Sequence, residues 1–590
     1  MIRRYYEDEL HYLHEAGKEF AAAHPEVARY LNIDSVSDRD PYVERLFEGF
    51  AFLTGRIRER LDDELPQITD GLFSFLWPHF LKPVPALSIL EFKARPGLVQ
   101  QTTAFPAGTE VRSVPVGDEA VQCRFRTTTA VRLQPFRLAD AVLSWPPDGT
   151  TSLTLKFDLD KNVEYKNLRI NPLRLYLHAE DTVASTVHLF ATRHVSRVTF
   201  GTGDRSQPGV TLSGQHWVRP AGLDAAEGIV PYSLYSFPGY RLLQEYLSFR
   251  RKFWFIDVFG FDRFSPPEKT GSFIVRIDFQ RAFPEEKKFK AENLRLFCAP
   301  VVNLFTTSAE PVRLTHRASE YRIVPDLHHP RSVEVYSVDA VSGVEEGSGK
   351  RQAYVPFYSY QHGVGSAHRF FTTSRPGPSD RMDTYLSAGG FATGETDLPA
   401  ETLSLEVTCT NGSLPREKLQ ERTITQPAPE FSNVATFENL TQPTLPLHPP
   451  GRNSVSIMRP RENFMWKLIS HLSHNFMSVA TPDALRSLLE LYDWSGTDAN
   501  RRRIDGVRDV RWNPKEIVVR GAVLRGTAVT IEVQDGHFAD EGDVCLFGLI
   551  MSEFFSAYAT LNSFVHLTVI TKPSEQTYRW EPLKGHRPLL

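Results

Sequence analysis

The chain has 590 residues, of which 41% are hydrophobic and 23% charged, and its formal net charge is −4. At roughly 150 residues per domain, this length predicts about four units, and the ordinary apolar content excludes wholesale disorder. The basic residues are scattered, and the short runs at 250–252 and 501–503 do not supply the sustained basic surface that nucleic acid binding requires.

Residues 1–86 are predicted to form a helical arm. In the segment 40–66, Asp40 is a suitable N-cap and Pro41 fits the first turn of a helix. An apolar stripe then follows the 3.6-residue period, while the opposite side is heavily charged. The stripe consists of Val43, Leu46, Phe47, Phe50, Leu53, Ile57, Leu61 and Leu65. It suits a bundle built from several chains, but packing on other helices of this chain explains it equally well.

Short alternating runs separated by Pro, Gly and Asp begin near residue 87 and predict strands. We expect a first β-rich domain over 87–230 and a second over 231–410. The weakly patterned stretch 411–460 is predicted to be a loop or linker. Helices return after it and are followed by strand candidates, so 461–590 is predicted to be an α+β domain. The expected fold class is therefore α+β and multidomain.

Two glycine-rich segments resemble phosphate-binding loops at first sight. In "GVEEGSGKR", residues 343–351, Arg351 stands where Ser or Thr should hold magnesium, and no helix follows. In "GTGDRS", residues 201–206, the nearby Pro208 and Gly209 prevent the helix whose N-terminus would bind a pyrophosphate. Both segments are therefore predicted to be turns.

Histidine pairs are the best candidates for a metal site. His328 and His329 precede Pro330 without carboxylates at ligand spacing, and the helical pair His471 and His474 has no recognisable third ligand. The four cysteines lie far apart and form no CxxC pair. Hydrolase motifs are also missing, so we expect no catalytic residue, no metal and no cofactor. A glycosidase-type pair of carboxylates stays open, because such a pair is defined by spatial separation.

The first residues lack the apolar core of a secretory signal. No later run approaches the roughly 18 apolar residues that span a bilayer. We therefore expect a cytoplasmic protein without direct membrane insertion.

A series of strings runs in order along almost the whole chain, and residues 374–460 contribute least to it. The series begins with "YYEDELHYLHEAGKEFAAAHPEVARYL" and "DPYVERLFEGFAFLTGRI", and continues through "FPAGTEV", "CAPVVNLF", "YSVDAV" and "TCTNGSLP" to "WKLISHLSHNF" and "DVCLFGLIMSEFFSAYATLNSFVHL". In this order and spacing, the strings resemble the TssF family, baseplate wedge subunits of the bacterial type VI secretion system.

That resemblance implies a structural protein without enzymatic activity, with a helical core bundle, β-rich wing domains and a C-terminal unit that joins neighbouring chains. It implies that two TssF copies associate with one TssG, and that wedges assemble around the VgrG spike under the contractile sheath. It also implies that TssE links the wedge to the sheath, while TssK connects the baseplate to the inner-membrane complex.

Two sets of residues are candidates for binding partner chains. The first is the apolar stripe of the segment 40–66, and the second lies in the C-terminal strings that match the family. For the second set, the alternative is that the aromatic side chains fill a domain core. The candidates are Val43, Leu46, Phe47, Phe50, Leu53, Ile57, Trp466, Asn475, Asn562, Ser563 and Phe564.

Two other functions stay open at this point. A carbohydrate-active enzyme with stacked β domains would present a cleft with two carboxyl groups about 5 to 10 Å apart. A phage-tail wedge protein would share the assembly mechanism and differ in genomic context.

Overall fold

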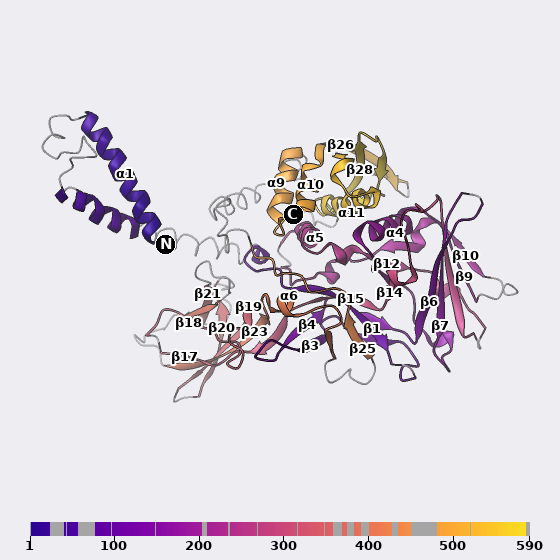
Figure 1. Cartoon of the computed structure of the whole chain (residues 1–590), viewed down its shortest axis with the longest axis horizontal. Helices are drawn as coiled ribbons and strands as arrows, with labels where there is room; N and C mark the ends of the chain where they lie inside the picture. Colours follow the sequence, from indigo (N-terminus) through magenta and orange to yellow (C-terminus); the bar gives the residue numbers. More distant parts are fainter. Residues whose placement is uncertain are drawn as a thin grey trace. The chain divides into compact units, whose positions relative to one another are not determined.

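The structure is a computed structural model of the chain and is shown in Figure 1. The chain divides into two compact units, Met1–Leu81 and Lys82–Leu590. Within them the structure describes residues 2–23, 41–42, 44–56, 77–95, 97–147, 149–202, 209–233, 236–267, 270–315, 317–346, 349–357, 369–374, 383–390, 400–427, 435–449, 481–519 and 521–585.

The described part of the N-terminal unit is almost entirely helical. It contains α1 (Ile2–Ala23), a second helix described at residues 41–42 and 44–56, and the short 3-10 helix η1 (Pro78–Phe80). The second helix includes Pro41, where the sequence predicted the first helical turn.

The larger unit begins with a six-stranded antiparallel sheet in the order β24-β3-β4-β15-β1-β25. Buried positions alternate along β4, and the inward side chains of the sheet form one core that includes Phe92, Phe125 and Phe437. A two-stranded pair, β2 and β5, adds Phe105 to this core. These strands are β1 (Leu87–Ala94), β2 (Thr103–Phe105), β3 (Glu110–Val116), β4 (Val121–Thr127), β5 (Val131–Leu133), β15 (Cys298–Val302), β24 (Ile424–Pro427) and β25 (Ala435–Asn439).

Two further antiparallel sheets follow, one of five strands in the order β10-β9-β13-β7-β6 and one of four in the order β11-β12-β8-β14. Helices α4 (Asp181–Arg193) and α5 (Pro238–Ser248) belong to the same stretch of chain, and the 3-10 helix η5 (Arg250–Phe253) follows α5. The strands are β6 (Phe136–Ser144), β7 (Ser152–Leu159), β8 (Leu173–Leu177), β9 (Val195–Gly201), β10 (Val210–Ser213), β11 (Val218–Pro220), β12 (Phe255–Val258), β13 (Ser272–Phe279) and β14 (Leu294–Leu296).

An eight-stranded sheet has the order β16-β23-β19-β20-β21-β22-β18, with β17 paired to β23. It has its own core, which includes Val335, Leu403 and Val407. The strands are β16 (Phe305–Ser308), β17 (Val312–Leu314), β18 (Tyr321–Arg322), β19 (Glu334–Glu345), β20 (Arg351–Pro356), β21 (Arg369–Ser374), β22 (Tyr385–Gly390) and β23 (Glu401–Thr410).

The C-terminal part combines helices with one sheet in the order β26-β27-β28-β29, with β30 paired to β28. Strands β27 and β28 run parallel, so α11 is the crossover helix between them. The elements are α9 (Pro482–Tyr492), α10 (Asp498–Asp505), β26 (Val507–Val519), β27 (Ala522–Gln534), α11 (Glu541–Ser556), β28 (Phe564–Lys572), β29 (Thr577–Arg579) and β30 (Leu583–Lys584).

The sheets combine segments that the sequence assigned to separate domains. Strand β13 lies between β7 and β9, β15 lies between β1 and β4, and β12 lies between β11 and β8, so the segments 87–230 and 231–410 share three sheets. The stretch 411–460, predicted to be a loop or linker, contributes α6 (Leu414–Lys418), β24 and β25, because its apolar residues Ile424 and Phe437 enter the first core. The α+β class is confirmed, whereas the boundaries of the five expected segments stay predictions.

Candidate interaction surfaces

One face of the second N-terminal helix is used inside its own unit. Ala51 and Gly55 on this face are buried. The His14 Nε2 atom of α1 lies 2.9 Å from Glu44 Oε1, and the His14 ring centroid lies 6.0 Å from that of Phe47. Positions 44, 47, 51 and 55 recur every three or four residues, so they share one face, and His14 places that face against α1.

Another face of the same helix carries large apolar side chains that stay exposed. Leu46 is 71% exposed, Phe50 56% and Leu53 60%. Their spacing of four and three residues is that of a coiled-coil seam, which places them in one line. Single exposed apolar residues are common on protein surfaces, whereas these three form one apolar line and are therefore the candidate surface on this helix. The stripe therefore divides into two parts. Phe47 packs within the unit, whereas Leu46, Phe50 and Leu53 are exposed. Val43 and Ile57 lie outside the described residues.

The C-terminal candidate residues differ in how far they are buried. Asn562 is exposed and Ser563 is half-buried, whereas Phe564 is buried at the start of β28. A Cβ atom on Gly526 of β27 would come within 2.4 Å of the Phe564 ring, so Phe564 fills the space that this glycine leaves. Phe564 is thus a core residue, as the alternative interpretation predicted, and its side chain is not available to a partner. Trp466 and Asn475 lie outside the described residues.

A second exposed apolar surface lies at the tip of the hairpin formed by β26 and β27. Strand β27 pairs with β28 from Thr527 onward, so the tip extends past the region of this parallel pairing. At the tip Val518 faces Val523 across the hairpin, and they are 73% and 62% exposed. Sequence reasoning missed this surface. The available signal was "IVVRGAVL", in which apolar runs flank an Arg-Gly turn, and Gly521 has a φ of 82°.

His328 and His329 belong to a loop organised by a carboxylate. Asp326 Oδ1 accepts a hydrogen bond of 2.8 Å from the His328 backbone N–H, and Asp326 Oδ2 lies 3.0 Å from His329 Nδ1. The second contact raises the pKa of His329. Among the residues that the structure describes, no group of three or more His, Cys, Asp or Glu side chains is placed to hold a metal ion. His471 and His474 lie outside them.

The two glycine-rich segments connect paired strands. Val344 of β19 pairs with Arg351 of β20, and Phe200 of β9 pairs with Val210 of β10, both antiparallel. Each segment therefore joins a β-hairpin and leads into a strand, whereas a phosphate-binding loop leads into a helix. Residues 347–348 and 203–208 lie outside the described ranges.

A small pocket lies beside β18 and β19. Its volume of about 50 Å³ has room for a few water molecules. Two of its lining residues are acidic, Glu334 and Asp383, and Asp383 Oδ1 accepts a hydrogen bond of 2.9 Å from Arg322 Nη2.

None of the helices in the described ranges combines the length and apolar character needed to cross a bilayer.

The family described as "Type VI secretion system, TssF" has a sequence model that matches residues 1–587 of this chain. The chain is also similar to the type VI secretion system component TssF1 of Pseudomonas aeruginosa. The two are 28% identical over 636 residues, a match that covers 100% of this chain and 99% of that relative.

Two solved structures contain similar chains. One is the TssK-TssF-TssG baseplate subcomplex of the type VI secretion system, with 33% identity, a TM-score of 0.78, and coverage of 93% of this chain and 99% of that chain. The other is the baseplate complex from the type VI secretion system, with 31% identity, a TM-score of 0.65 and full coverage, 100%, of both chains. Since the family match spans nearly all residues, the chain belongs to the TssF family of the type VI secretion system.

Proposed function

We propose that this chain is a structural wedge subunit of a type VI secretion baseplate and that it works by joining other chains, without catalysis. The observation that supports this proposal is the exposed line of Leu46, Phe50 and Leu53. The helix that carries the line already packs its other face inside its own unit, through Glu44 and Phe47.

The apolar line is the strongest source of binding energy on this helix. Each Leu or Phe side chain that becomes fully buried in a complex contributes about 1.5 to 3 kcal/mol. A surface ion pair contributes at most about 1 kcal/mol. The apolar line therefore outweighs the charged residues that flank it.

The spacing of the line indicates a helical partner. Val43 and Ile57 continue the three- and four-residue steps of Leu46, Phe50 and Leu53 in the sequence, which gives a seam of five positions. A seam of this kind packs into the groove of another apolar helix. The partners we propose for it are TssG and a second copy of this chain, and the similar chain in the TssK-TssF-TssG subcomplex supports TssG.

The rest of the proposal concerns the assembled machine. The wedge binds TssK and TssE, surrounds the VgrG spike, and docks at the inner-membrane complex on the cytoplasmic side, where it positions and triggers the sheath. The C-terminal part joins neighbouring chains through exposed positions. The residues we propose there are Asn562, Trp466 and Asn475, together with the hairpin tip at Val518 and Val523.

A pair of variants on one helix tests the apolar line. Phe50 and Phe52 are 56% and 45% exposed, and two residues of helix place them on opposite sides of it. In coexpression with the neighbouring wedge genes, Phe50→Asp should reduce copurification with TssG at least about tenfold, because it puts a charge where the proposed partner would bury the ring. Phe52→Asp should copurify like the unchanged chain.

Circular dichroism of both variants shows whether the fold is retained. A folded Phe50→Asp chain that binds TssG normally would rule out this interface. Mass measurement of the unchanged complex tests the expected composition, two copies of this chain with one TssG.

A further inference from the structure

The turn that begins α11, residues 539–543, carries three carboxylates, and each of them contacts a distant part of the chain. Asp540 is the first. The Ser185 Oγ atom of α4 lies 2.7 and 2.9 Å from its two carboxylate oxygens and donates a hydrogen bond to it. The Lys287 ammonium lies 3.6 Å from the same carboxylate. Asp540 thus contacts two residues that precede it by more than 250 positions.

The next carboxylate is more exposed and forms a two-pronged ion pair. Glu541 accepts hydrogen bonds from the Nη1 and Nη2 atoms of Arg281 at 3.1 and 2.6 Å. Arg281 follows β13, so this contact also reaches back to the five-stranded sheet.

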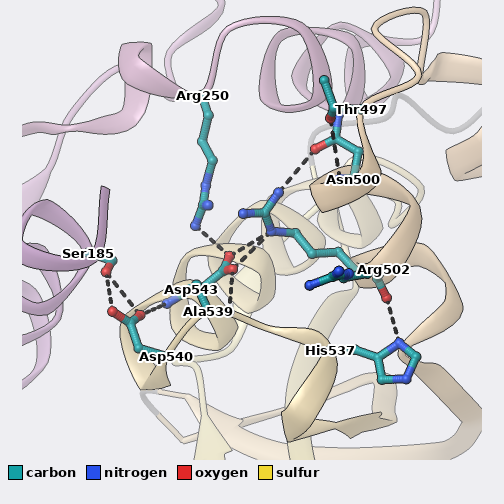
Figure 2. A network of polar contacts seen from close by, with 10 residues as sticks. Ser185, Arg250, Thr497, Asn500, Arg502, His537, Ala539, Asp540 and Asp543 are labelled. Carbon is teal, nitrogen blue, oxygen red and sulfur yellow. Dashed lines mark hydrogen bonds and ion pairs between the residues drawn. The ribbon is translucent and has the colours of Figure 1, made fainter. Parts of the chain in front are cut away.

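The third carboxylate, Asp543, lies at the centre of the network in Figure 2 and its side chain is 1% exposed. Arg250 donates to it from η5, and Arg503 of α10 donates through Nε at 2.9 and 3.0 Å. The Ala539 backbone N–H donates to it at 3.0 Å. Two guanidinium groups therefore compensate one buried carboxylate, and either guanidinium alone would leave a weaker junction.

At Gly542 the backbone of the turn lies directly against the backbone of α4. A Cβ atom on Gly542 would come within 2.3 Å of the carbonyl oxygen of Ser185, so the turn and α4 touch through main-chain atoms. Asp540 is the N-cap of α11 and accepts the Asp543 backbone N–H at 2.9 Å, which fixes the turn before it meets α4. Carboxylates are also favoured at a helix N-terminus. The acidic turn is therefore preformed. The segment 181–290 supplies three of the basic side chains described here, Arg250, Arg281 and Lys287, whereas Arg503 belongs to the C-terminal segment itself.

The other end of α11 is held by aromatic rings. Phe237, at the start of α5, packs against Tyr558 with ring centroids 4.2 Å apart, and it meets the edge of Phe554 at 6.0 Å. The Tyr240 and Tyr558 hydroxyls are 3.1 Å apart. Figure 1 shows α11, in yellow, beside α4 and α5, so the helix contacts both along its length.

We propose that the turn 539–543 is an ionic latch that locks the C-terminal segment 481–585 to the segment 181–290, so that the two open and move as one body. Only one residue separates α4 from β9. A mechanical force on the C-terminal segment is then transmitted through α4 to β9 and so to the five-stranded sheet. The latch is a property of the chain itself and does not depend on the proposed partners.

Hydrogen exchange of the full chain, followed by mass spectrometry, tests the latch. Asp543→Asn removes the buried charge and keeps the shape of the side chain. Amide protection should fall in α11 and also in α4 and α5, by roughly tenfold or more in each. Asp505→Asn is the matched control, since this carboxylate lies exposed at the end of α10, and it should leave all three helices unchanged.

A milder variant keeps the test decisive if Asp543→Asn does not fold. Ser185→Ala removes the hydroxyl that bonds to Asp540 and changes nothing on α11 itself. Protection should then fall in α11 as well as in α4. Loss confined to the segment that carries the substitution, with either variant, would show two independent bodies and overturn the latch.

Discussion

At the scale of single residues, His188 of α4 is a buried group with a shifted protonation equilibrium. Its ring lies 5.8 Å from that of Trp254, and burial, followed by the nearby charge of Arg250, lowers the pKa of His188 to about 4. An unfolded histidine has a pKa of about 6.5. Between these two values the unfolded chain binds a proton that the folded chain does not bind, so the folded state loses stability as the pH falls through this range.

This difference predicts a pH-dependent stability that one substitution removes. Between pH 7 and pH 5, the contribution of His188 to the free energy of unfolding should fall by about 2 kcal/mol. Urea unfolding at both pH values should show a smaller pH dependence for His188→Gln than for the unchanged chain. His216→Gln replaces an exposed histidine and serves as the control. Equal pH dependence in all three chains would contradict a neutral, buried His188.

At the scale of elements, the apolar stripe of the segment 40–66 shows what sequence periodicity predicts and what it does not. The pattern correctly predicted a helix that includes Pro41, and it placed Phe47 and Phe50 in one stripe. They are three residues apart, about 60° around the helix, and this angle separates the side chain near His14 from the exposed one. Which part of a broad stripe is covered depends on the neighbouring helix, and a local pattern does not contain that information. Phe47→Asp would therefore disturb the helix pair as well as any interface.

The hairpin of β26 and β27 consists of two energetically different halves. Ile531 in β27 is buried where β28 pairs with it, whereas Val518 is exposed at the tip. Ile531→Ala should lower the free energy of unfolding by about 2 to 5 kcal/mol, because it leaves a cavity in the core. Val518→Ala should change it by less than about 0.5 kcal/mol. Urea titration measures both, and a large cost for Val518→Ala would mean that the tip is covered within the chain.

At the scale of the whole molecule, the sequence predicted strands better than it predicted their partners. Alternation identified the segments that became β1 and β15, but these strands pair although about 200 residues separate them. Pairing at that distance depends on the path of the chain, so the shared sheets could not be predicted from local patterns. The acidic turn at Asp540 and Asp543 was equally hidden, because its sequence is that of an ordinary helix start.

The C-terminal part packs against α5, so deleting all of it does not separate a joining role from a role in folding. Truncation after residue 460 removes α9 and α11, which cover Tyr240 and Tyr246 of α5 through ring contacts with Tyr492 and Phe547. We expect the truncated chain to aggregate with or without partners, since it exposes a large apolar surface. Size-exclusion chromatography should show this aggregation, and a monodisperse truncated chain would contradict the packing described for α5.

A smaller deletion separates joining from folding. Replacing residues 516–525 with a two-residue turn removes Val518 and Val523 but retains the pairing of Lys515 with Gly526 and all of α11. Because the removed residues are at the hairpin tip, the melting temperature should stay within a few degrees of the unchanged chain. Copurified wedge complexes should nevertheless become smaller, as measured by mass photometry. A stable tip-deleted chain that forms complexes of unchanged mass would exclude the hairpin from joining the wedge, and the exposed Asn562 would be the next position to test.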